Sequence, residues 1–452
     1  MLKKIFSYGT VEGLAKGLNK ITLLVLPFFL STIDYGKVGL LVAIEMIIPL
    51  ISLLGLERAV LRFYSQKIKF KNFSKTISKS VFWTHLFLLL LLVFFYLIGS
   101  RTFFGLNIFP DLILIIILIY FQGVNLITFN MLRVDEKHNQ YFRGRLFFQF
   151  SKIILVLSFV YFLDNYLGYL IGSIIASIFT VVIFKEKAQE ISRKNVFDKK
   201  TFSILFNFSW PFIFHGVASN LLGNADKFIL ERFMTLEEVG KYTLAYSIGS
   251  TMVFAFVGIS VFLEPMIYKE ENNRKRQLLL NKFLFLTLCS GLTAYIIISL
   301  SSQYILPLFY KNEYHLILKY IPLIAISYLI YPFYLKSNYN MIYEKKSLKI
   351  AFTSLFSASI NIILNIIFIP IYGVYAAVFT TFISYILQSF IFILISNNFK
   401  INSEFLEVTF FGIVLILCFF YNASIFSIIS FMSIYLVFFY YFKLKKMKEY
   451  EV

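Results

Sequence analysis

Stretches of about twenty apolar residues recur from one end of the chain to the other, and each is long enough to cross a bilayer as a helix. Hydrophobic residues make up 59% of the 452 residues, and short polar segments separate the apolar ones. No polar stretch is long enough to form a large domain outside the membrane. The pattern therefore predicts an all-α membrane protein that crosses the bilayer many times.

We place about fourteen transmembrane helices along the chain. The loop charges described next require an even number of spans, and twelve would satisfy the same requirement. The fourteen predicted spans cover residues 10–32, 37–56, 80–98, 111–132, 143–163, 166–184, 204–230, 239–263, 281–300, 316–336, 348–369, 373–395, 405–421 and 423–442.

Basic residues outnumber acidic ones by 43 to 24, which gives a formal net charge of +19. In a soluble chain this excess would suggest a nucleic-acid partner. The basic residues instead gather on alternate loops, for example between Arg58 and Lys79 and between Lys185 and Lys200. Cytoplasmic loops of membrane proteins carry this excess. We therefore expect both termini in the cytoplasm and no nucleic-acid partner.

The longest polar stretch divides the chain near its middle. An internal repeat supports this division, because Asp34–Leu41 after the first span aligns with Glu238–Ala245 after the seventh, and both contain acid-x-Gly-Lys. Both copies then begin on the same side of the membrane, which is typical of parallel repeats with a substrate path between them. The expected parts are an N-lobe of helices 1–6 at 1–184, a basic cytoplasmic linker at 185–203, a C-lobe of helices 7–12 at 204–395, and two additional helices with a basic tail at 396–452.

Polar residues share one face of the first span, at helical spacing. They are Glu12, Lys16, Asn19 and Lys20. Charge inside a membrane is expensive, so such residues face either a wet cavity or a partner. A buried Glu12–Lys16 ion pair that only fixes helix packing is the alternative, but we favour a cavity lining. The same lobe carries further polar residues in its spans, namely Glu45, Gln122, Asn125 and Lys152.

The seventh span carries two neighbouring polar stripes, which indicate another inward-facing surface. One contains Asn220, Asn224, Lys227 and Glu231, and the other His215, Ser219 and Asp226. Lys227 could instead extend to the outer interface, and His215 taken alone is more typical of a packed core histidine. In the eleventh span, Asn361 and Asn365 are typical of hydrogen bonds between helices.

Several charged residues are candidates for a gate or for ion coupling. Glu57 and Arg58 lie at the inner end of the second span, although an ordinary positive-inside loop explains the arginine equally well. Glu12, Glu45 and Asp226 are the remaining candidates, because a membrane-buried carboxylic acid can exchange a proton near working pH.

The sequence contains no Walker A loop, no Cys-x-x-Cys and no His-Glu-x-x-His motif. Both cysteines, Cys289 and Cys418, fall inside predicted spans, where they behave as small apolar residues. We therefore expect no catalytic residues, no metal and no cofactor. If energy is needed, a proton or sodium gradient would supply it.

Three blocks resemble one family. They are Tyr35–Ser65, Asn220–Ser247 ("NLLGNADKFILERFMTLEEVGKYTLAYS") and Ser359–Tyr385 ("SINIILNIIFIPIYGVYAAVFTTFISY"). Their order and spacing are similar to those of polysaccharide exporters, the O-antigen-type lipid-linked oligosaccharide flippases of the multidrug/oligosaccharidyl-lipid/polysaccharide (MOP) superfamily. The resemblance implies two six-helix lobes in a V around a central cavity, as in MATE transporters, often with two further C-terminal helices.

The resemblance also implies an activity, which is the flipping of undecaprenyl-diphosphate-linked repeat units to the outer leaflet of the bacterial inner membrane. Such units build O-antigen or capsule, so a glycan polymerase and glycosyltransferases are the implied partners besides membrane lipids. Lys16 and Lys20 match the positions of cavity-facing basic residues in related lipid flippases. The headgroup is expected to contact these two and Lys152, with Asn220, Asn224 and Lys227 also lining its path.

Two other functions fit a chain of this kind. An ion-coupled multidrug antiporter of the same superfamily would favour an acidic cavity for cationic substrates, whereas Lys16 and Lys152 point the other way. A membrane glycan polymerase or ligase usually carries a large outer loop with catalytic residues. The longest outer loop of this chain, near 301–315, is short.

Overall fold

The computed structural model describes residues 2–70, 72–184, 197–396, 403–420 and 425–440. Most of the linker predicted at 185–203 and of the basic tail lies outside these ranges. Seven of the described helices are long and apolar enough to cross a membrane, or eight if the bent pair Asn312–Leu318 and Tyr320–Tyr343 forms one span. The predicted fold class, an all-α protein with many spans, is confirmed. The count of fourteen stays a prediction with which the helices are consistent.

The chain divides into two compact units. The first unit comprises Leu14–Thr243, and the second comprises Met1–Gly13 together with Leu244–Val452. Helix α1 (Leu2–Val25) starts in the second unit and continues in the first, whereas α10 (Leu236–Gly249) starts in the first. The division into lobes at 1–184 and 204–395 stays a prediction.

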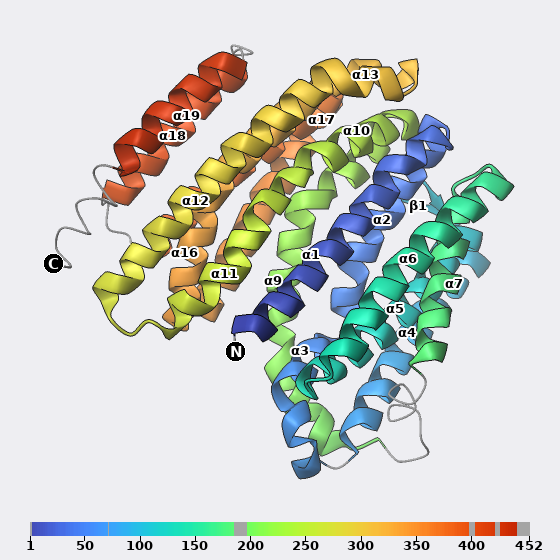
Figure 1. Ribbon diagram of the computed structural model, residues 1–452. Helices are drawn as coiled ribbons and strands as arrows, with labels where there is room; N and C mark the ends of the chain where they lie inside the picture. Colours follow the sequence, from blue (N-terminus) through green and yellow to red (C-terminus); the bar gives the residue numbers. More distant parts are fainter. Residues whose placement is uncertain (1, 71, 185–196, 397–402, 421–424, 441–452) are drawn as a thin grey trace. The chain divides into compact units, whose positions relative to one another are not determined.

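The first unit is a bundle in which α6 packs along α7, and α2 packs against α5 and α9 (Figure 1). One of its connections forms an antiparallel two-stranded hairpin. After α1 its elements are η1 (Leu26–Phe28), α2 (Thr32–Ser52), α3 (Leu56–Phe63), η2 (Tyr64–Lys69), α4 (Phe73–Leu97), β1 (Thr102–Phe103), β2 (Leu106–Asn107), η3 (Ile108–Leu112), α5 (Ile113–Val134), α6 (His138–Leu163), α7 (Leu167–Ile183) and α9 (Lys199–Phe233).

In the second unit, the long helix α12 packs against α11, α15, α16 and α19 (Figure 1). Its elements after α10 are η4 (Ser250–Val253), α11 (Phe254–Lys269), α12 (Asn273–Leu300), η5 (Ser301–Ile305), α13 (Leu306–Phe309), η6 (Asn312–Tyr314), α14 (His315–Leu318), α15 (Tyr320–Ser327), η7 (Tyr328–Ile330), α16 (Tyr331–Tyr343), α17 (Ser347–Ser396), α18 (Ser403–Phe420) and α19 (Ile425–Phe439).

Helix α17 is two antiparallel spans joined at a glycine. Gly373 has φ +57° and ψ −135°, which breaks the helix at the turn expected between the eleventh and twelfth spans. Asn361 donates to the Ser384 hydroxyl at 3.0 Å, and Thr380 donates to Asn365 Oδ1 at 2.5 Å. These bonds pair residues on either side of the turn. The prediction that the asparagines of the eleventh span bond to a neighbouring helix is confirmed.

The second predicted span is broken. Helix α2 contains Pro49 and ends at Ser52, and the residues Leu54 and Gly55 that follow both have positive φ. A side chain at Gly55 would place its Cβ 2.8 Å from the carbonyl oxygen of Ser209, so this glycine also permits a close approach to α9. The break separates α2 from α3. It leaves irregular backbone inside the bundle, where protein rather than lipid surrounds it.

The glycines of the internal repeat meet in the structure. A Cβ added at Gly36 would lie 2.1 Å from the carbonyl oxygen of Leu236, and one added at Gly240 would lie 1.9 Å from that of Thr32. In both cases the opposing carbonyl belongs to the residue four positions before the other glycine. This reciprocity means that the starts of α2 and α10 cross about a local two-fold axis. The repeat seen in the sequence is therefore a structural one.

Candidate functional site

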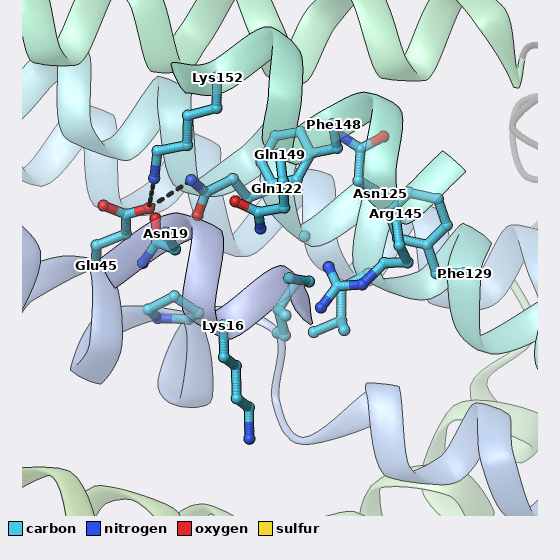
Figure 2. A pocket seen from close by; sticks show the side chains of 15 residues that line it. Lys16, Asn19, Glu45, Gln122, Asn125, Phe129, Arg145, Phe148, Gln149 and Lys152 are labelled. Atoms are coloured by element: carbon cyan, nitrogen blue, oxygen red, sulfur yellow. Dashed lines mark hydrogen bonds and ion pairs between the residues drawn. The ribbon is translucent and has the colours of Figure 1, made fainter. Parts of the chain in front are cut away.

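A cavity of about 290 Å³ lies within the first unit, between α1, α2, α5 and α6 (Figure 2). Several residues that the sequence places in separate spans meet around it. Its polar lining consists of Lys16, Asn19, Glu45, Gln122, Asn125, Arg145, Gln149 and Lys152. Apolar residues complete the walls, among them Pro49 and Leu53 beside the break in the second span.

Glu45 is the centre of the hydrogen-bonded group at one end of this cavity. Its Oε1 accepts hydrogen bonds from Lys152 Nζ at 3.1 Å and from Gln122 Nε2 at 2.5 Å. Its Oε2 accepts one from the Tyr169 hydroxyl at 2.5 Å. The four side chains come from α2, α6, α5 and α7, so the group ties four helices together. We call it the Glu45 group.

At this end of the cavity, the positive charge of Lys152 and the negative charge of Glu45 offset each other. The side chain of Lys152 is only 3% exposed, and its ammonium also lies 3.5 Å from the Tyr169 hydroxyl. A buried ammonium is tolerated when a carboxylate and further hydrogen bonds compensate it. Lys152 thus lies in the cavity lining with its charge balanced by Glu45.

Lys16 and Arg145 supply the remaining cations of the lining. Lys16 is exposed, and its side chain extends away from the Glu45 group (Figure 2). The guanidinium carbon of Arg145 lies 5.4 Å from the centre of the Phe129 ring, within reach of a cation–π contact. Glu12 lies one turn before Lys16, is half-buried, and is not part of the lining.

A second polar cluster forms on α9, apart from the cavity lining. Asp226 accepts a short hydrogen bond from the Tyr242 hydroxyl, and Lys227 Nζ donates to Asn224 Oδ1 at 3.0 Å. The Asn224 amide donates to the carbonyl oxygen of Asn220 at 3.1 Å. Asp226 is 1% exposed and Lys227 is 4% exposed. The structure therefore buries Lys227 inside the unit.

The sequence-predicted residues thus fall into two groups. Lys16, Glu45 and Lys152 share the cavity. Lys20 is half-buried and is not part of this lining. The α9 cluster contains Asn220, Asn224, Asp226 and Lys227.

The candidate gate residues lie on α3, just after the break in the second span. The side chain of Arg58 is 60% exposed, that of Glu57 is 14% exposed, and Arg58 Nε lies 3.9 Å from Glu57 Oε1. Asn130 of α5 donates to the backbone carbonyl of Glu57 at 3.2 Å, which holds α3 against α5.

Sequence reasoning missed several polar residues of these clusters. Arg145, Gln149 and Lys152 recur at helical spacing on one face of α6, but sequence reasoning singled out only Lys152 of the three. It also did not single out Tyr169 and Tyr242 among the 30 tyrosines of the chain. Both donate to buried carboxylates.

The chain is similar to known membrane transporters. Residues 1–269 match a family described as polysaccharide biosynthesis proteins, and residues 211–367 match the family called MatE. No curated protein sequence matches the chain.

Solved structures share the fold at low sequence identity. The lipid II flippase MurJ, in an inward closed conformation, is 18% identical with a TM-score of 0.67, over 94% of this chain and 97% of that one. An inward-facing multidrug resistance MATE family transporter of the MOP superfamily is 13% identical with a TM-score of 0.59, over 90% and 95% of the two chains. A mutant of the Vibrio cholerae MATE transporter VcmN is 15% identical with a TM-score of 0.52, over 88% and 94%.

Proposed function

Because the chain belongs to the polysaccharide biosynthesis protein family of the MOP superfamily, we propose that it flips lipid-linked oligosaccharides across the bacterial inner membrane. The substrate is an undecaprenyl-diphosphate-linked repeat unit for a cell-surface polysaccharide such as O-antigen or capsule. It moves from the cytoplasmic to the outer leaflet by alternating access. Both termini are cytoplasmic in this proposal, and a glycan polymerase and glycosyltransferases act on the same repeat units.

The charge of the cavity is the observation that supports this proposal most strongly. Its lining contains Lys16, Arg145 and Lys152 but only one carboxylate, that of Glu45. A diphosphate carries negative charge and needs cations and hydrogen-bond donors in place of water. The lipid tail has no such need and can stay in the hydrocarbon. A cavity between helices that carries several basic and polar side chains suits the headgroup of such a substrate.

The same proposal assigns roles to the charged residues around the cavity. Lys16, Lys20 and Lys152 bind the headgroup, and Asn220, Asn224 and Lys227 line its path. Glu57 and Arg58 gate the cytoplasmic side, and Glu12 is a further gate or coupling candidate. If a proton or sodium gradient drives transport, Glu45 and Asp226 are the coupling carboxylates, because each sits in a buried hydrogen-bonded group.

An ion-coupled multidrug antiporter is the second candidate. The MatE match over residues 211–367 and the similarity to MATE structures favour it. A cationic drug, however, would meet three cations and a single carboxylate in this cavity, and that carboxylate is already paired with Lys152. Native mass spectrometry of the purified protein with undecaprenyl diphosphate and with a cationic dye separates the two. The flippase retains the lipid and not the dye, and the antiporter shows the reverse.

Replacing both Lys16 and Lys20 with glutamine should lower the initial flipping rate at least tenfold while leaving membrane insertion intact. The change removes two cations and keeps polar side chains of similar length. Flipping is measured as the transfer of a fluorescent undecaprenyl-diphosphate oligosaccharide between the leaflets of reconstituted vesicles. Lys345→Gln with Lys349→Gln is the matched control, because both lysines are exposed and outside the lining. Normal flipping by the Lys16/Lys20 variant would refute the role of these lysines.

A further inference from the structure

Two polar residues on the α6 wall of the cavity lie outside the Glu45 group. Arg145 and Gln149 are one helical turn apart on α6, on the same wall as Lys152 (Figure 2). Gln149 is 7% exposed, and its Oε1 is buried without a hydrogen-bond partner. Burying an acceptor without a donor is unfavourable, because the group loses its hydrogen bond to water and gains none in return. A bound molecule that donates a hydrogen bond to this oxygen would remove that cost.

Arg145 adds a cation beside this acceptor. Its guanidinium lies against Phe129, which limits the positions that the side chain can take. A guanidinium presents several N–H donors in one plane and can bind two oxygens of a phosphate at once. The wall therefore offers donors to an anion at Arg145 and an acceptor to a hydroxyl at Gln149. A ligand that satisfies both carries a phosphate next to a hydroxylated group.

The volume of the cavity limits how much of a ligand can enter. Pockets that hold whole small molecules span roughly 300–1,000 Å³. At about 290 Å³, this cavity has room for one sugar ring or for phosphate groups with part of a ring, and not for an oligosaccharide. Only one end of a long headgroup can therefore occupy it, and the Arg145 cation favours the end that carries the phosphate. The other sugars must lie elsewhere.

On the premise that the substrate is a lipid-linked oligosaccharide, we propose that Arg145 and Gln149 form the subsite for its first sugar. Arg145 binds the phosphate that joins this sugar to the lipid, and Gln149 Oε1 accepts a hydrogen bond from a sugar hydroxyl. Gln149 thereby distinguishes a loaded lipid from a bare one, because the bare lipid leaves the buried acceptor unpaired. The subsite makes the protein selective for lipids that already carry a sugar.

Two lipids test the subsite directly. The probes are undecaprenyl diphosphate bearing one sugar and undecaprenyl diphosphate without a sugar, titrated into the purified full-length protein and followed by native mass spectrometry. Gln149→Leu should weaken binding of the sugar-bearing lipid about tenfold and change binding of the bare lipid less than twofold. Arg145→Gln should weaken both lipids about tenfold, because both carry the phosphate.

Control variants and melting temperatures show whether a loss of binding comes from the subsite or from general damage to the protein. Arg143→Gln and Gln140→Leu make the same changes at exposed positions of α6 outside this lining and should bind both lipids normally. Gln149→Leu removes an unpaired buried group, so its melting temperature should equal or exceed that of the wild type. If Arg145→Gln fails to insert into the membrane, Arg145→Lys is used in its place. This variant should weaken binding of both lipids by a smaller factor.

The outcomes separate this subsite from the proposed function. Equal weakening of both lipids by Gln149→Leu, or normal binding by Arg145→Gln, would overturn the subsite and leave the flippase standing. Failure of the wild-type protein to bind either lipid would overturn both. Loss of sugar discrimination confined to the Gln149 variant would support the subsite.

Discussion

Replacing Glu45 with leucine should destabilise the protein by about 3–5 kcal/mol, the usual effect of removing one partner of a buried ion pair. The ammonium of Lys152, 3% exposed, would keep its charge without its carboxylate. Gln122 and Tyr169 would lose their acceptor in the same change. The melting temperature of the purified protein in detergent measures the effect, and flipping should fall with it.

The double variant Glu45→Leu with Lys152→Met is the control for this prediction. It removes both charges and fills their space with apolar side chains, a change that is often close to neutral. Its melting temperature should therefore recover most of the loss seen in the single variant. If Glu45→Leu alone melts like the wild type, the Glu45 group does not hold its four helices together as its geometry indicates. A stable double variant that no longer flips lipid would separate stability from transport.

Replacing Gly36 with alanine should destabilise the protein, whereas the same substitution in an ordinary helix stabilises it. Alanine normally stabilises a helix by about 1 kcal/mol relative to glycine. At Gly36, however, the new Cβ would lie 2.1 Å from the carbonyl oxygen of Leu236, a backbone atom that cannot rotate away. We expect a loss of about 1–3 kcal/mol, as for overpacked cores, seen as a lower melting temperature.

Gly17→Ala is the matched control for the Gly36 variant. A Cβ at Gly17 meets no atom within 4 Å, so this variant should melt at the same or a higher temperature. Gly240→Ala should repeat the Gly36 result, because its Cβ would lie 1.9 Å from the carbonyl oxygen of Thr32. An unchanged melting temperature for both Gly36→Ala and Gly240→Ala would show that the crossing of α2 and α10 is looser than the structure indicates.

The sequence predicts the membrane fold because hydrophobic length alone determines which segments can span a bilayer. The repeat around Gly36 and Gly240 was also visible, since both copies keep the same small residue where the helices cross. The break after α2 was not predicted. Pro49 and Gly55 are consistent with it, but a proline within a span often kinks a helix without ending it.

The site could be predicted only in part, because sequence spacing does not determine how each helix is rotated about its axis. The polar residues of the first, second, fourth and fifth spans were expected to line one cavity, and the structure brings Lys16, Glu45 and Lys152 together there. Spacing within one helix could not show that Lys152 pairs with Glu45, 107 positions away. For the same reason, spacing in the first span could not show that Lys16 lines the cavity whereas Lys20 does not.

The proposed function requires the protein to carry a lipid-linked oligosaccharide from one leaflet to the other. The most direct measurement reconstitutes the purified protein in vesicles with a fluorescent undecaprenyl-diphosphate oligosaccharide and follows its arrival in the opposite leaflet with a membrane-impermeant quencher. We predict protein-dependent transfer that the Lys16→Gln and Lys20→Gln changes together reduce at least tenfold. Absence of transfer with several glycan headgroups, together with expulsion of cationic dyes under an imposed ion gradient, would contradict the account and identify an antiporter.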